Sequence, residues 1–264
     1  MKPLYKWPGG KASELEIIRN NIPKGFNKYI EPFFGGGALF FDLSYENNVI
    51  NELNKEVVIF LSLIKKGMGI DIYNEMSKLS NDEKTYYEVR SSTAITDLEV
   101  AVRFYYLRKT CFRGLVRYNK SGGFNAAYGH YKTYNFEELL DKRYEELLSN
   151  TIIMNDDFSK VFEENNKPDS FCFLDPPYHN AFSNYMSDGF TDERHIELAR
   201  YFEKSNMKCL MIIGKTDLIE ELYDGYIVGE YGKKYLITKA TDEERQSKED
   251  RKIKENSHLI IRNF

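Results

Sequence analysis

The residues with the clearest chemical potential are Asp175-Pro176-Pro177-Tyr178, which directly follow the apolar run Phe171–Leu174. Four apolar residues that stop at Asp-Pro-Pro are typical of a buried strand that ends at the edge of a sheet. Each proline lacks an N–H and fixes its φ, so the carbonyl groups here have no strand pairing to join. Open α/β sheets bind their ligands at the carboxyl ends of the strands. A carboxylate, a rigid carbonyl and an aromatic ring at that place suit an exocyclic amine on a flat base, whereas the motif by itself is more typical of a turn leaving a strand.

A glycine-rich turn, Phe33-Phe34-Gly35-Gly36-Gly37, lies where a short expected strand meets its helix. Glycines there remove Cβ atoms, so a ligand can approach the backbone closely. Glu52 ends the next expected strand, where an acidic side chain hydrogen-bonds ribose hydroxyls. The turn alone serves many ligands, but the turn together with Glu52 indicates an adenosine-containing cofactor.

The N-terminal segment Trp7–Lys11 contains Gly-Gly-Lys but does not fit a phosphate-binding loop. A Walker A motif needs a glycine where Tyr5 stands and a serine or threonine where Ala12 follows the lysine. Phosphoryl transfer is therefore not indicated. The only tryptophan, Trp7, precedes a turn, and it either belongs to the core or walls a pocket.

A basic and aromatic stretch runs from Arg103 to Tyr134 and contains no Asp or Glu. In a protein of net charge −4 and pI about 5.8, this stretch is typical of a local surface for phosphates and bases. A solvated helix followed by a polar loop explains the charges equally well. The basic residues are Arg103, Arg108, Lys109, Arg113, Arg117, Lys120 and Lys132.

The elements that must position these residues alternate between strand and helix. Strands are expected at Lys28–Ile30 and Val49–Asn51 around a helix at Ala38–Leu43, which opens a Rossmann-like sheet. Amphipathic helices from Lys55 to about Thr110 then interrupt the sheet, and the interruption predicts an inserted helical domain that ends near Asn135. Asn135 is expected to cap one continuous helix through Leu148, and Ser13–Glu16 is expected to form a capping box.

Strands resume after the insertion, at Thr151–Met154, Phe171–Leu174 and Cys209–Ile213, with a helix from about Asp192 to Lys204. Three further strands are expected at Tyr226–Val228, Tyr235–Ile237 and His258–Ile261. The charged segment 241–256 is expected to be a mobile loop.

Composition describes an ordinary globular chain of 264 residues, 42% of them hydrophobic. No apolar run approaches the roughly 18 residues of a membrane span, and the start has no signal-peptide pattern. The cysteines Cys111, Cys172 and Cys209 are expected to be buried free thiols in a reducing compartment. Histidines and cysteines lack zinc-ligand spacing, so no metal is expected. We expect a cytoplasmic, DNA-associated protein, and a viral or mobile-element gene is compatible with this expectation.

Five segments in order carry a resemblance to a known family. The segments are Lys6–Lys11, Glu31–Gly37, Thr110–Asn119, Gly123–Asn125 and Asp175–Tyr178. Together they resemble the Dam-type family of DNA adenine-N6 methyltransferases, and the likeness extends over essentially the whole chain. The resemblance implies a class I, S-adenosyl-L-methionine-dependent α/β fold with an inserted, mostly helical target-recognition domain. It divides the chain into a discontinuous catalytic domain, 1–54 and 135–264, and a recognition domain, 55–134.

The resemblance also implies roles for individual residues. It places Asp175, Pro176 and Tyr178 at the methyl-accepting base, which must be flipped out of duplex DNA. The implied cofactor-binding residues are Trp7, Lys11, Phe33, Gly35, Gly37, Glu52, Asp157, Phe158 and Asp175. The implied DNA-binding residues are Lys6, Arg113, Leu115, Arg117, Asn119 and His130, with Arg117 as the candidate for bidentate guanine readout. No obligate protein partner or membrane is implied, and the protein is expected to be a monomer or a weak dimer.

The chain departs from the family pattern at several positions. Arg113 stands where Asn is common, Ala126-Ala127 where Val-Pro is common, and His130 where another basic residue is frequent. Glu52 replaces the usual Asp, and Ile213–Lys215 replaces a Ser-Asn pattern. The familiar GATC target is therefore not implied. Cytosine-N4 methylation and an inactive DNA-binding relic of the same fold are the alternative functions.

Overall fold

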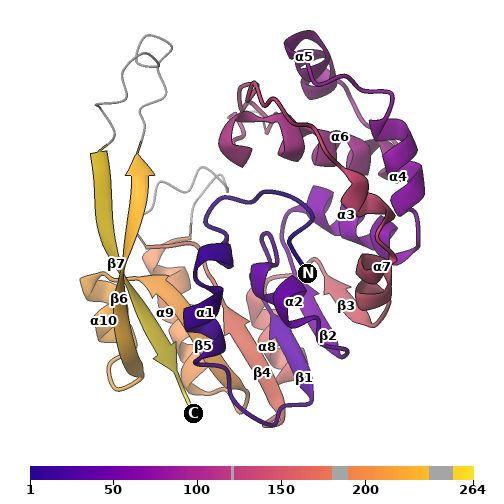
Figure 1. Cartoon of the computed structure of the whole chain (residues 1–264). Coiled ribbons are helices and arrows are strands. Elements are labelled where there is room, and N and C mark those ends of the chain that lie inside the picture. The colour runs from indigo at the N-terminus through magenta and orange to yellow at the C-terminus, as the bar shows by residue number, and fades with distance from the viewer. Residues whose placement is uncertain (120–121, 180–189, 238–251) are drawn as a thin grey trace.

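The computed structural model describes residues 1–119, 122–179, 190–237 and 252–264. These residues form one twisted seven-stranded sheet of order β3-β2-β1-β4-β5-β7-β6 (Figure 1). The strands are β1 Lys28–Glu31, β2 Asn48–Asn51, β3 Thr151–Met154, β4 Ser170–Leu174, β5 Lys208–Gly214, β6 Ile227–Ile237 and β7 Lys252–Arg262. Strands β1 to β5 pair in parallel, and β7 pairs antiparallel with both β5 and β6. This arrangement confirms the predicted Rossmann-like α/β sheet.

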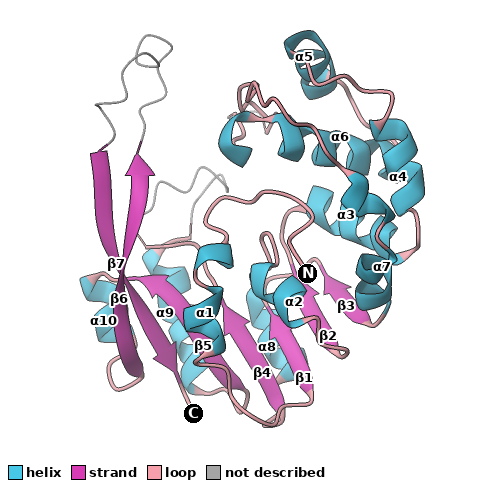
Figure 2. Ribbon diagram, in the orientation of Figure 1, coloured by secondary structure: helices cyan, strands magenta, loops and turns pink. Residues whose placement is uncertain are grey.

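Helices cover both faces of the sheet (Figure 2). One face carries α1 Leu15–Arg19 and α2 Ala38–Leu43, and the other carries α8 Phe158–Asn165, α9 Asp192–Glu203 and α10 Asp217–Leu222. Neighbouring strand residues point to opposite faces, so Tyr29 packs in the cluster of α2 while Ile30 packs in the cluster of α8 and α9. Among the described residues, no helix combines the length and apolar character that a membrane crossing needs.

A helical layer separates β2 from β3 in the sequence. It comprises α3 Lys55–Lys65, α4 Gly69–Met76, α5 Glu83–Ser91, α6 Asp97–Thr110 and α7 Lys142–Ser149. The chain between α6 and α7 contains two short 3-10 helices, at Phe112–Gly114 and Glu137–Leu140. In Figure 1, α4, α5 and α6 lie beyond the carboxyl ends of the parallel strands, on the side toward which the β6–β7 hairpin also extends. In contrast, α3 and α7 lie beside β3: Lys65 at the end of α3 donates to the carbonyl of Thr151, and α7 ends at Ser149, directly before β3.

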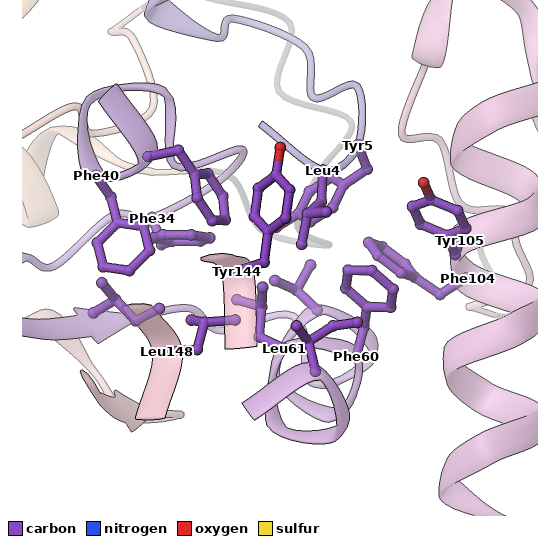
Figure 3. Close-up of a cluster of buried hydrophobic side chains, with 14 of the residues drawn as sticks. Leu4, Tyr5, Phe34, Phe40, Phe60, Leu61, Phe104, Tyr105, Tyr144 and Leu148 are labelled. Carbon is purple, nitrogen blue, oxygen red and sulfur yellow. The ribbon is translucent and has the colours of Figure 1, made fainter. Parts of the chain in front are cut away.

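One hydrophobic cluster runs from the sheet into this helical layer without interruption (Figure 3). Phe34 and Phe40 lie at the sheet end of the cluster, and Phe60 and Phe104 lie in α3 and α6. The ring of Tyr5 joins the two parts, at 5.8 Å from the Phe60 centroid and 5.1 Å from that of Phe104. The helical layer therefore shares its core with the sheet.

Four predicted elements differ in the structure. The expected helix from Asn135 is a 3-10 helix followed by a separate α7, because Asp141 accepts a hydrogen bond from the Arg143 N–H and begins a new helix. The two strands expected around 226–237 are the single strand β6, since its whole length pairs with β7. Residues 252–256 belong to β7 rather than to a loop, and 241–251 lie outside the described residues. The predicted capping box at Ser13 is absent, because Ser13 ends the 3-10 helix Lys11–Ser13 and Glu14 caps α1 without a side-chain bond.

Candidate active site

The Asp-Pro-Pro-Tyr turn leaves the carboxyl end of β4, the strand at the middle of the sheet. The Lys11 ammonium forms an ion pair with the Asp175 carboxylate at 2.5 Å, and the Lys11 side chain is only 2% exposed. Burial raises the pKa of the Asp175 carboxyl, and the Lys11 ammonium opposes that rise. The ion pair with Lys11 therefore favours the charged form of a carboxylate that burial disfavours. The resemblance placed Lys11 at a cofactor, and the structure adds this direct contact with Asp175.

The glycine-rich turn holds Glu52 beside the end of β1. The Gly35 N–H donates to one carboxylate oxygen of Glu52 at 2.8 Å, and the Asn54 N–H donates to the other at 2.9 Å. Burial raises the pKa of Glu52, and these two backbone donors counteract the rise. The carbonyl of Gly35 accepts from the Tyr5 hydroxyl at 2.7 Å. Both backbone groups of Gly35 are therefore fixed, and the Glu52 carboxylate is held in one orientation.

Trp7 lies directly over this turn. A Cβ on Gly35 would lie 2.9 Å from the indole ring, and a Cβ on Gly36 would lie 2.9 Å from the Cβ of Trp7. The glycines at these positions make room for the tryptophan. Gly37 has a φ of 62° and precedes α2, and a Cβ there would lie 2.3 Å from Cζ of Phe34. Trp7 thus forms one wall above the glycine turn, and Gly37 allows the tight entry into α2.

An aromatic group lies at the neighbouring strand ends. The Phe33 and Phe158 rings are 5.4 Å apart, and Phe190 contacts both, at 5.8 and 5.9 Å. Asp157 caps α8 by accepting from the Ser159 N–H at 3.0 Å, and it pairs with Arg194. Burial raises the pKa of Asp157, but the bonds from Ser159 and Arg194 outweigh it, so the net shift is downward. Flat rings beside an ionised carboxylate are groups that bind a purine.

Tyr178 lies next to β5, whereas the aromatic group of Phe33 and Phe158 lies on the other side of Asp175. The Lys11 ammonium lies 4.9 Å from the centroid of the Tyr178 ring. A Cβ on Gly214, at the end of β5, would lie 3.1 Å from the Tyr178 ring. Lys11 therefore contacts two of the residues that the resemblance places at the target base, Asp175 and Tyr178.

A second group of predicted residues lies in the chain that follows α6. Arg113 has a φ of 55°, an uncommon conformation for a residue with a side chain, and its N–H donates to the Tyr131 hydroxyl at 2.8 Å. The Lys6 ammonium lies 3.9 Å from the centroid of the Tyr131 ring. A Cβ on Gly114 would lie 2.7 Å from Cβ of Lys6. The segment that carries Lys11 therefore touches the segment that carries Arg113.

Arg117 lies in a small antiparallel turn closed by the bridge between Tyr118 and Phe124. Its guanidinium donates to the side chain of Asn125 and to the Asn125 carbonyl, both at 2.8 Å. Asn119 shapes the same turn, because its side-chain oxygen accepts from the Gly123 N–H at 2.8 Å. The guanidinium of Arg117 is thus exposed but held in a defined direction.

The remaining predicted DNA-contact residues have different surroundings. Leu115 is 36% exposed, and His130 has a φ of 52° with its ring 4.6 Å from Tyr128. Part of the basic stretch is engaged inside the protein: Arg103 pairs with Glu56, Lys109 pairs with Glu138, and the buried Arg108 donates to the carbonyls of Gly114 and Leu115. These three cations organise the helical layer, so the charge available to a partner comes from the later part of the stretch.

Some site groups were not singled out from the sequence. Glu31 ends β1, is 2% exposed, and accepts from the Tyr29 hydroxyl at 2.8 Å. Burial raises the pKa of Glu31 well above its usual range, the Tyr29 bond opposes the rise, and the charge of Asp175 adds to it. Arg194 lies 4.4 Å from the Phe158 ring. Arg194 lies in the first turn of a charged helix, and nothing in that position predicts the contact. Glu31 could have been found, because it is a carboxylate that ends a buried strand.

Among the described residues, no group of three His, Cys, Asp or Glu side chains is arranged to hold a metal ion. The three cysteines are buried and free, as predicted. The parallel strand ends, the Gly35–Glu52 contact and the Asp175 turn together define a protein of the Rossmann-like methyltransferase class.

Comparisons with known proteins give the family. A family model described as D12 class N6 adenine-specific DNA methyltransferase matches residues 7–244. The Type II methyltransferase M.CviBI of Paramecium bursaria Chlorella virus NC1A is 46% identical over 269 residues and covers all of both chains. The Type II methyltransferase M.MjaIII of Methanocaldococcus jannaschii is 31% identical, over 90% of this chain and 93% of its own. The DNA adenine methylase of Haemophilus influenzae is 30% identical, over 85% of this chain and 83% of its own.

The chain belongs to the D12 class of N6 adenine-specific DNA methyltransferases. It is therefore an enzyme that methylates the N6 amine of adenine in DNA, as the resemblance of its five segments implied. Cytosine-N4 methylation is not favoured.

Proposed function

We propose that this enzyme takes the methyl group from S-adenosyl-L-methionine and transfers it to an adenine flipped out of double-stranded DNA. The observation that carries the proposal is the Asp175 turn at the end of β4, charged by Lys11 and placed between the Gly35–Glu52 contact and Tyr178. The residues proposed to accept the amine and those proposed to bind the adenosine then lie at the ends of the neighbouring strands β4 and β1.

The residues around the glycine-rich turn Gly35–Gly37 suit the methyl donor. The Glu52 carboxylate, fixed by two backbone N–H groups, suits the ribose hydroxyls, and the Phe33 and Phe158 rings with Asp157 suit the adenine. The Trp7 ring covers Gly35 on this side of the turn. When bound, S-adenosyl-L-methionine supplies an electrophilic methyl group on a sulfonium.

Asp175 and Pro176 act on the target amine. The lone pair of an adenine amine is delocalised into the ring, so the nitrogen is a weak nucleophile. Asp175 and the carbonyl of Pro176 accept its two N–H groups, which turns the lone pair out of the ring plane and toward the methyl group. Lys11 keeps Asp175 ionised for this role, and Tyr178 stacks on the base. Positioning then supplies much of the rate, because no covalent intermediate with the protein is required.

We infer that the inserted segment 55–134 recognises the DNA sequence. Arg117, whose direction Asn125 holds, reads a guanine in the major groove, while Arg113, Asn119, His130 and Lys6 contact the backbone or neighbouring bases. Leu115 offers an exposed apolar contact for a base or a thymine methyl. The relatives named Type II methyltransferases support a role in a restriction-modification system, and we propose that the protein acts as a monomer.

The test measures methyl transfer and cofactor binding separately. Purified protein is incubated with labelled S-adenosyl-L-methionine and duplex DNA of mixed sequence, and the nucleosides are then analysed. We expect N6-methyladenine with the wild type and at least about a thousandfold less with Asp175→Asn, the scale of a lost group at the reacting atom. Asp169→Asn, an exposed carboxylate before the start of β4, is the matched control and keeps full activity.

Each outcome decides between the alternatives. DNA binding with neither methylation of any DNA nor cofactor binding by calorimetry indicates an inactive relic. N4-methylcytosine in the digest indicates the cytosine enzyme. Sequencing of the methylated DNA then gives the recognition sequence.

A further inference from the structure

A buried polar cluster lies behind the Asp175 turn, and none of its members was assigned a role in catalysis, cofactor binding or DNA binding from the sequence. It consists of Glu14, Tyr231, Lys233 and His258, and we call it the Glu14 cluster. Glu14 is 3% exposed and His258 is fully buried. Glu14 precedes α1, three residues after Lys11, whereas Tyr231 and His258 are paired residues of β6 and β7. The cluster therefore ties the N-terminal segment to the base of the β6–β7 hairpin.

Both oxygens of the Glu14 carboxylate are occupied. One oxygen accepts from the Tyr231 hydroxyl at 2.5 Å and from Nδ1 of His258 at 2.7 Å, and the other accepts from the Lys233 ammonium. Burial alone would raise the pKa of Glu14, but the donors from His258, Lys233 and Tyr231 outweigh it and lower the pKa to about 2. The carboxylate is ionised, so we assign the proton of the contact to Nδ1 of His258.

His258 connects this cluster to Tyr178. The Tyr178 hydroxyl lies 3.5 Å from Nδ1 of His258, and the two rings meet edge to face at 5.2 Å and 85°. The Lys11 ammonium lies over the Tyr178 ring, and Gly214 leaves space for the ring beside β5. Tyr178 is therefore confined by three groups, and its hydroxyl end is the one that contacts the Glu14 cluster.

We propose that His258 and Glu14 are positioning residues that hold the Tyr178 ring in the orientation for stacking on the flipped adenine. This inference rests on the proposed role of Tyr178. A buried carboxylate with several donors costs desolvation energy, and well-packed apolar residues often serve stability equally well. The cluster lies behind Tyr178 and Lys11, and this position gives it a role in the reaction. Glu14 fixes the tautomer and orientation of His258, and His258 in turn fixes the Tyr178 ring that stacks on the base.

A double-mutant cycle between Tyr178→Phe and His258→Leu tests this. Tyr178→Phe keeps the stacking ring and removes the hydroxyl, while His258→Leu removes the ring nitrogen that faces it. The readouts are the single-turnover methylation rate of preformed enzyme–DNA–cofactor complex and, separately, the cofactor Kd by calorimetry. We expect each single variant to lose about tenfold in rate with its cofactor Kd unchanged within about twofold. The double variant should lose about the same tenfold instead of the product of the two losses.

Two further variants separate positioning from folding. In His258→Asn the side-chain N–H lies near the place of Nδ1, so this variant should recover most of the rate that His258→Leu loses. Tyr45→Phe removes a hydroxyl bond to the Phe26 carbonyl far from Tyr178, and its effect should simply multiply with that of His258→Leu. If His258→Leu does not fold, the same cycle is run with His258→Gln against Tyr178→Phe, because the glutamine amide reaches the place of Nε2 and leaves the place of Nδ1 without a donor.

The inference is overturned if the losses of Tyr178→Phe and His258→Leu multiply. It is also overturned if Tyr178→Phe is as fast as the wild type, or if His258→Asn is as slow as the leucine variant. Failure of the proposed function shows itself differently, because the wild type itself would then form no N6-methyladenine.

Discussion

Replacing Glu14 with glutamine examines the energetics of the Glu14 cluster, because the change keeps the shape of the side chain and removes its charge. The pKa of Glu14 falls from an ordinary 4.5 to about 2 in the folded protein. One pKa unit is worth about 1.4 kcal/mol, so the ionised carboxylate contributes about 3 kcal/mol to the free energy of unfolding at pH 7. Since the folded-state pKa is the lower one, this contribution is complete above the unfolded pKa and is lost as the pH falls toward 2.

Urea unfolding of wild type and Glu14→Gln, followed by the fluorescence of Trp7, measures this contribution. We expect the variant to be less stable by about 3 kcal/mol at pH 7 and by about 1.5 kcal/mol at pH 3, where the carboxyl is almost fully protonated in the unfolded chain and mostly ionised in the folded one. Glu75→Gln, which breaks the exposed pair with Lys78, is the control and should cost less than about 1 kcal/mol. A stability difference that stays the same at pH 7 and pH 3 would refute the electrostatic reasoning.

Three other predictions concern the site and its supports. Lys11→Met removes the ammonium that opposes the rise in the pKa of Asp175, so the acid limb of the methylation rate moves to higher pH, because only the ionised carboxylate accepts from the amine. Gly37→Ala places a Cβ 2.3 Å from Phe34 at a φ of 62°, and thermal unfolding should show a loss of about 2–3 kcal/mol. Arg117→Lys keeps the charge but loses the planar fork, so the ratio of rates on cognate and single-mismatch duplexes should fall roughly tenfold.

These predictions have clear contrary results. An acid limb that stays in place in Lys11→Met would show that the ion pair does not control Asp175. A Gly37→Ala protein as stable as the wild type would show that the α2 entry relaxes without cost. An Arg117→Lys protein that loses rate equally on all duplexes would make Arg117 a phosphate contact instead of a base reader.

The parts of the fold that the sequence predicted well are those with strong local signals. The helix Ala38–Leu43 and the strand Thr151–Met154 match the structure residue for residue, because glycines or polar turns bound short apolar runs. The strand β6 was split in the prediction, because Gly229 and Gly232 read as a turn. Pairing with β7 along its whole length overrides that local preference, and no local pattern reveals such pairing.

The candidate site shows the same division. The motif residues Asp175, Gly35 and Glu52 were visible because turns at strand ends bring ligand-binding groups to one edge. The Glu14 cluster was not, since Glu14 is more than two hundred residues from its three partners, which are themselves brought together by the pairing of β6 with β7. Glu14 instead looked like part of a helix-capping motif, which the backbone of α1 does not use.

The Tyr5 contact bears on how recognition can be exchanged between members of this family. Tyr5 packs on Phe60 and Phe104 while its hydroxyl binds the Gly35 carbonyl, so a graft cut at residues 55 and 134 would divide one core and separate matched aromatic partners. The segment 112–131 carries the proposed DNA contacts and joins that core through fewer large side chains, chiefly Phe124 and Tyr128. New sequence specificity should therefore be sought by transplanting this shorter segment, with Lys6 changed alongside it because Lys6 contacts Gly114 and Tyr131.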